Sequence, residues 1–131
     1  MFLHMLNDDQ KRAFAALALK MTAADGTMVG RETAKLRSLA GEMNLDLADW
    51  DKAGGVAELA SAFTDRRSKV VALLELLGLA YSDTSYQGIE ESLVDEVARA
   101  MNLSDDDLKR LETWVGQHVD HARKAFALMR E

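Results

Sequence analysis

The sequence predicts an all-α domain, and three observations carry that prediction. Residues that favour helix (Ala, Leu, Glu, Lys, Arg and Met) dominate the composition. Proline is absent from the 131 residues, and no stretch alternates β-branched and polar residues as a half-buried strand does. Apolar residues recur instead at steps of three and four, in segments that predict about seven helices. The length suits a single domain with its own core.

The first two helices have clear ends. Asn7, followed by two acids, is predicted to cap a helix that stops at Gly26. A second helix is predicted over Gly30–Met43, with Asn44 in the left-handed conformation that ends many helices. Two short helices follow on either side of the Gly54–Gly55 break, one over Leu47–Lys52 and one that begins near residue 56.

The most apolar segment is VVALLELLGLAY, which follows Asp65 and ends near residue 82. It is apolar nearly all round, so we expect this helix at the centre of the bundle. A sixth helix is predicted over Gly88–Met101, and Asn102 repeats the role of Asn44 at its end.

The last helix is predicted to run from a capping Ser104 to the end of the chain. Asp107 stands three residues after Ser104, where a capping box has Glu. Acids at the start and basic residues near the end of this helix suit its dipole. Its apolar stripe comprises Leu108, Leu111, Val115, Val119, Ala122, Phe126 and Met129.

The N-terminal residues MFLHML form an apolar stretch of six. They lack the basic start and long apolar core of a signal peptide. No run approaches the ~18 apolar residues of a membrane-spanning helix. We therefore expect a disordered or loosely packed leader over residues 1–6, a single domain over 7–131, no membrane insertion and a cytoplasmic location.

The net charge and the absence of cysteine limit the classes of function that this sequence can have. The net charge of −6 disfavours nucleic acids and anionic membrane surfaces, and favours cations and basic partners. Without cysteine there is no disulfide, thiolate nucleophile or thiolate metal site. The sequence shows no Ser-His-Asp pattern, phosphate loop or dinucleotide fingerprint, so we do not expect an enzyme.

An offset of 58 residues aligns the chain with itself, residues 16–50 with 74–108. Two acids, a glycine and a helix-ending Asn-Leu pair all recur at this same offset, which rarely happens by chance. The matched pairs are Leu19 with Leu77, Asp25 with Asp83, Gly30 with Gly88, Glu32 with Glu90, Ala40 with Ala98, Met43–Asn44–Leu45 with Met101–Asn102–Leu103, and Asp49 with Asp107. This predicts two related helix–loop–helix halves, with their loops close together.

Each predicted loop resembles the second half of an EF-hand. Asp25, Gly26 and Glu32 have the spacing of loop positions 5, 6 and 12. Positions 1 and 3 would be Met21 and Ala23, whose side chains have no oxygen. The second loop also lacks acids at these positions, so neither loop can be a working EF-hand alone.

Two half sites could make one metal site. Asp25, Glu32, Asp83 and Glu90 would supply four carboxylates, which suit calcium, magnesium or manganese. The alternative is that the acids serve only as helix caps. A Glu in a first turn favours the helix dipole, and an Asp before glycine often bonds the local backbone. The protein would then be a helical interaction module without metal.

The Ala24–Asp25–Gly26 motif with Glu32, its echo around Asp83 and Glu90, and the helix count resemble the TerB tellurite-resistance family. The resemblance covers most of the chain. Similar domains occur at the N-terminus of membrane-anchored DnaJ-like co-chaperones. The second loop departs from the pattern, because it has Thr84 where a glycine would be expected.

This resemblance implies a non-enzymatic role in stress resistance, within larger protein assemblies near the inner face of the membrane. It also implies metal binding by the acidic cluster. Tellurite is an oxyanion whose detoxification favours thiols, and this chain has no thiol and a negative charge. We therefore expect an indirect role, through metal sensing or binding of partner proteins.

Three further features have two interpretations each. Arg66, Arg67 and Lys69 crowd a helix N-terminus, where basic charge opposes the dipole; either Asp65 offsets them or they form a docking patch. The seven methionines and two tryptophans are interpreted as core, with an exposed interaction surface at the tryptophans as the alternative. The pair His118 and His121 has zinc-ligand spacing but lacks an evident third ligand, which favours a polar face.

Overall fold

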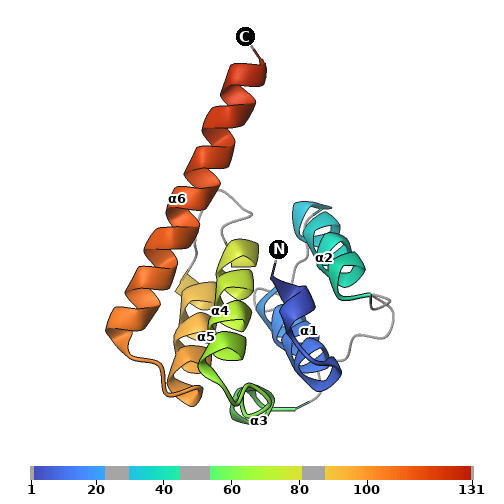
Figure 1. Ribbon diagram of the computed structural model, residues 1–131, viewed down its shortest axis with the longest axis vertical. Helices are drawn as coiled ribbons and strands as arrows, with labels where there is room; N and C mark the ends of the chain where they lie inside the picture. The colour runs from blue at the N-terminus through green and yellow to red at the C-terminus, as the bar shows by residue number, and fades with distance from the viewer. Residues whose placement is uncertain (1, 23–29, 45–53, 81–87, 131) are drawn as a thin grey trace.

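A computed structural model describes residues 2–22, 30–44, 54–80 and 88–130 (Figure 1). These residues form one 3-10 turn and six α-helices, and they contain no strand. The elements are η1 (Leu3–Met5), α1 (Asp8–Thr22), α2 (Gly30–Met43), α3 (Val56–Ala60), α4 (Arg66–Ala80), α5 (Gly88–Ala100) and α6 (Asp105–Met129). The all-α prediction is confirmed. The predicted short helix Leu47–Lys52 lies outside the described residues.

Helix α4 lies at the centre of the bundle, as its composition predicts. It packs against η1, α1, α5 and α6 (Figure 1). Because other elements cover most sides of α4, its apolar side chains are removed from water. The burial of each large apolar side chain stabilises the fold by roughly 1.5–3 kcal/mol. The buried residues of α4 are Ser68, Val71, Ala72, Leu73, Glu75, Leu76, Leu77, Leu79 and Ala80.

Side-chain caps fix the starts of α1 and α6. The Asn7 side-chain oxygen accepts a hydrogen bond from the Gln10 N–H at 2.8 Å, and the Gln10 side chain accepts one from the Asn7 N–H at 3.1 Å. This reciprocal pair is a capping box. At α6, the Ser104 hydroxyl accepts the Asp107 N–H at 3.1 Å. Both predicted caps are confirmed.

Asparagine ends both α2 and α5 in the predicted left-handed conformation. Asn44 has φ 58° and Asn102 has φ 59°. After α5, the Leu103 N–H donates to the Ala98 carbonyl and the Asn102 N–H to the Arg99 carbonyl, each at 3.0 Å. These bonds form a Schellman motif, which satisfies carbonyls that the helix leaves unpaired.

The N-terminal residues pack more firmly than the expected leader. Leu3 is fully buried, Leu6 is buried, and residues 3–5 form η1. The Phe2 N–H also donates to the Glu75 carboxylate of α4 at 2.8 Å. The apolar residues of MFLHML act here as core side chains, so residues 2–6 belong to the folded domain.

The C-terminal half of α6 projects beyond the other helices (Figure 1). Its predicted stripe is buried at Leu108 and Val115, but Phe126 is 62% exposed and Met129 is 76% exposed. The expectation that methionines are core residues is therefore wrong for Met129, and for the exposed Met5.

Candidate functional site

The structure describes only part of the predicted metal site. Asp25 and Asp83 lie outside the described residues. Glu32 and Glu90 lie in the first turns of α2 and α5, and their side chains are likewise outside the described part. The grouping of the four carboxylates thus stays a prediction.

The described helix ends nevertheless constrain where the two loops begin and end. In Figure 1, α1 and α4 run toward the end of the molecule from which α6 projects, and α2 and α5 run back from it. The C-termini of α1 and α4 and the N-termini of α2 and α5 therefore lie toward one end of the bundle. The positive ends of the α2 and α5 dipoles favour negative charge there.

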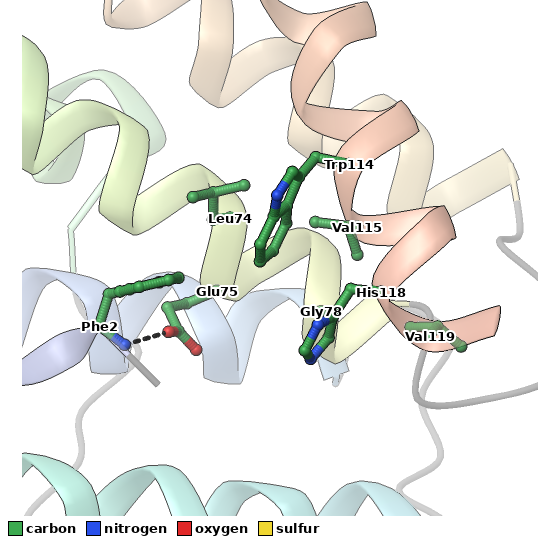
Figure 2. Close-up of a pocket in the computed structure, with 8 residues that line it drawn as sticks. All are labelled: Phe2, Leu74, Glu75, Gly78, Trp114, Val115, His118 and Val119. Atoms are coloured by element: carbon green, nitrogen blue, oxygen red, sulfur yellow. Dashed lines mark hydrogen bonds between the residues drawn. The ribbon is translucent and has the colours of Figure 1, made fainter. Parts of the chain in front are cut away.

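A small cavity lies between the N-terminal residues, α4 and α6 (Figure 2). Its volume is about 100 Å³, below the roughly 300–1,000 Å³ of common ligand pockets. Apolar and aromatic side chains dominate the lining, with one carboxylate and one imidazole. The lining residues are Phe2, Leu74, Glu75, Gly78, Trp114, Val115, His118 and Val119.

Glu75 is the buried carboxylate that lines this cavity, and it was not among the site residues predicted from the sequence. Its side chain is only 7% exposed, and its carboxylate accepts the Phe2 N–H (Figure 2). The signal was a lone acid in the apolar segment VVALLELLGLAY. Because burying a charged group without hydrogen-bonding partners is costly, such an acid points to a bonded position.

Aromatic contacts form the α6 side of the cavity. The Trp114 and His118 rings stack with centroids 5.2 Å apart and planes 7° apart. Phe2 approaches Trp114 at a centroid distance of 6.2 Å and an angle of 53°, within the range of favourable aromatic pairs. Trp114 remains 43% exposed. His118 therefore contributes to an aromatic cluster, and the described residues contain no group of three or more potential metal-ligating side chains.

The basic patch at the start of α4 is partly paired. Arg66 makes two hydrogen bonds of 3.2 Å to the two carboxylate oxygens of Asp107 on α6. These bonds hold the pKa of Asp107 below its usual value. Asp65 caps α4 by accepting the Ser68 N–H at 3.1 Å. Hydrogen bonds from Ser68, chiefly from its hydroxyl, lower the pKa of Asp65. Asp107 therefore offsets the charge of Arg66, and Asp65 caps the helix, while the docking role of the patch stays a prediction.

No helix in the described ranges combines the length and apolar character needed to cross a bilayer. The resemblance to the TerB family rests on the two loop motifs and remains a prediction. Searches found no matching protein-family model, no matching curated protein and no matching solved structure.

Proposed function

We propose that this chain is a non-enzymatic, TerB-like helical domain that binds a divalent cation between its two acidic loops and docks to partner proteins. One observation carries the proposal. In both halves, the first helix (α1 or α4) runs toward the same end of the bundle, and the second helix (α2 or α5) runs back from it. The helix ends that flank both loops lie toward one end of the bundle (Figure 1). Asp25, Glu32, Asp83 and Glu90 would supply oxygen ligands suited to calcium, magnesium or manganese.

Equivalent positions in the two halves support a duplicated unit. Met43 and Met101 are both buried, and the asparagine after each has nearly the same positive φ. Ala40 and Ala98 are buried as well. These three pairs share the 58-residue offset that also relates the acids. A duplicated helix pair gives each loop an equivalent start and end, which supports a shared site.

The resemblance to TerB proteins suggests that the domain serves tellurite-type stress resistance. On this proposal the protein contributes by cation binding and protein docking, and cation occupancy tunes the docking.

A second candidate is an interaction module without metal, in which the acids only cap helices. The exposed apolar residues of α6 favour it, because they offer a binding surface that needs no cation. The two candidates differ in whether a divalent cation stabilises the fold.

Thermal unfolding with added calcium, magnesium or manganese separates these candidates. We expect wild type to gain stability, by roughly 2.7 kcal/mol at a cation concentration of 100 times the dissociation constant. We expect Asp25→Asn to stabilise the cation-free protein, because it removes one of four converging negative charges, and to weaken the cation response.

Asp106→Asn is the matched control, because it removes an exposed acid from the first turn of α6. The cation response should be unchanged in this variant. Identical melting curves of wild type with chelator and with each cation would contradict cation binding and leave the interaction module as the proposed function.

A further inference from the structure

The apolar stripe of α6 stays on one face of the helix from Leu108 to Met129. The stripe residues follow one another at steps of three or four, which together make three heptads. Side chains at this spacing lie one above another along the helix. Over the first half, α4 packs against α6 and the stripe is buried at Leu108 and Val115. Over the second half, Phe126 and Met129 are exposed. The apolar face of α6 that packs against α4 thus continues beyond the part that α4 covers.

A shallow groove lies on this uncovered half, with a volume of about 460 Å³. Phe126 and Met129 line it together with Arg123 and Arg130. The two arginines are seven residues apart, which places them on the same side of the helix, about 10 Å apart along its axis. The groove therefore combines an apolar floor with a basic flank.

The basic flank is available for a partner. Within the described residues, neither Arg123 nor Arg130 forms an ion pair. Lys124, on another side of the helix, is 3.8 Å from the Asp120 carboxylate. Guanidinium groups bind carboxylates with paired hydrogen bonds, and in partly buried sites these bonds are stronger than neutral ones.

We propose that the C-terminal half of α6 binds an amphipathic helix of a partner protein, one with an apolar stripe flanked by Asp or Glu. The partner helix packs on the same face of α6 as α4 does, beyond the point where α4 ends. Its apolar residues cover Phe126 and Met129, and its carboxylates pair with Arg123 and Arg130. This proposal rests on the docking part of the proposed function and does not require the cation to be bound.

Charge distinguishes this partner from a second copy of the chain. Antiparallel pairing of two such helix ends would bring Arg123 of one copy near Arg130 of the other. Like charges placed opposite each other oppose association. An acidic helix instead neutralises the basic flank while it covers the apolar residues.

Fluorescence anisotropy with two synthetic helical peptides tests the proposal. Both peptides carry the same Leu and Ala stripe over about three heptads, with Glu at the flanking positions of one and Lys at those of the other. We expect the Glu peptide to bind at least about tenfold more tightly, and added salt to weaken its binding. Arg123→Glu with Arg130→Glu should reverse the preference, and Phe126→Asp should abolish binding of both peptides.

Lys124→Glu is the matched control, since it reverses a charge on the same turn outside the groove, and it should leave affinity within about twofold. Equal affinity for the two peptides, binding of neither, or no effect of the arginine reversal would overturn the proposal. So would a dimer in sedimentation that Phe126→Asp dissolves, or tighter binding to phosphatidylserine vesicles than to the Glu peptide. A cation response with no peptide binding would overturn this inference alone.

Discussion

Glu75 is a carboxylate in the middle of the most apolar helix of the protein. It links α4 to the N-terminal residues, because it accepts the backbone N–H of Phe2 at 2.8 Å. That bond holds Phe2 beside Trp114, while Leu3 enters the core next to it. Glu75 thus helps to hold the N-terminal residues against α4 and α6, and the Glu42 carboxylate of α2 holds them as well by accepting the Leu3 N–H at 3.2 Å.

Glu75→Ala should therefore destabilise the protein, because the Phe2 N–H loses its acceptor in a partly buried position. We expect a loss of about 1–3 kcal/mol in the free energy of unfolding, measured by urea denaturation. Glu75→Gln should cost less, since its amide oxygen can still accept this bond. Glu58→Ala, which removes an exposed acid from α3, should change stability by less than about 0.5 kcal/mol. Equal losses for the Gln and Ala variants would contradict this role.

At the scale of elements, the starts of α4 and α6 are joined by the ion pair of Arg66 and Asp107. The guanidinium contacts both carboxylate oxygens, and the Asp107 N–H also binds Ser104. The same aspartate therefore takes part in the helix cap through its backbone and in the link between helices through its side chain.

This pair predicts a pH-dependent contribution to stability. Arg66 lowers the pKa of Asp107 in the folded state, so the folded protein binds fewer protons than the unfolded chain as pH falls. The stabilisation is complete above the unfolded pKa of about 4 and is lost as pH falls through the lower folded pKa. Arg66→Gln should reduce the melting temperature slightly at pH 7, and the difference from wild type should disappear in strong acid.

Arg67→Gln is the control for this pH effect, because it removes the neighbouring charge and leaves the pair with Asp107 intact. It should give a smaller difference at pH 7. A difference between Arg66→Gln and wild type that persists unchanged in strong acid would contradict the role of the ion pair.

The elements also show what local sequence could and could not predict. Caps at Asn7, Ser104 and the two left-handed asparagines were predictable, because each depends on a few neighbouring residues. The partner of Arg66 was not, because it lies 41 residues away. The exposure of Phe126 was not predictable for a similar reason: periodicity identifies an apolar face, but the packing of distant segments such as α4 and Phe2 determines how much of that face is covered.

The candidate site was less predictable than the fold. Residue types and spacing suggested which cations four carboxylates could hold, yet convergence of two loops is a property of the whole bundle. The cavity beside Trp114 likewise depends on three segments far apart in the sequence. Local sequence patterns do not show which distant segments contact one another in the fold.

At the scale of the whole molecule, the proposed sites share one end. The helix ends that flank the two loops and the projecting half of α6 lie toward the same end of the protein (Figure 1). A cation bound between the loops would therefore change the charge on the side of the molecule where a partner helix is proposed to bind. This arrangement offers a physical route by which cation occupancy tunes docking.

The projecting half of α6 should contribute to binding and little to folding. Deletion of residues 121–131 removes side chains that are mostly exposed over the described residues 121–130, so we expect the free energy of unfolding to change by less than about 1 kcal/mol. Deletion from residue 112 onward also removes the buried Val115 and the cover over α4, and should cost at least about 3 kcal/mol. Urea denaturation of both truncated proteins checks the contrast. A large loss from the shorter deletion would mean that this half of α6 packs on the body, and its apolar residues would then serve the fold.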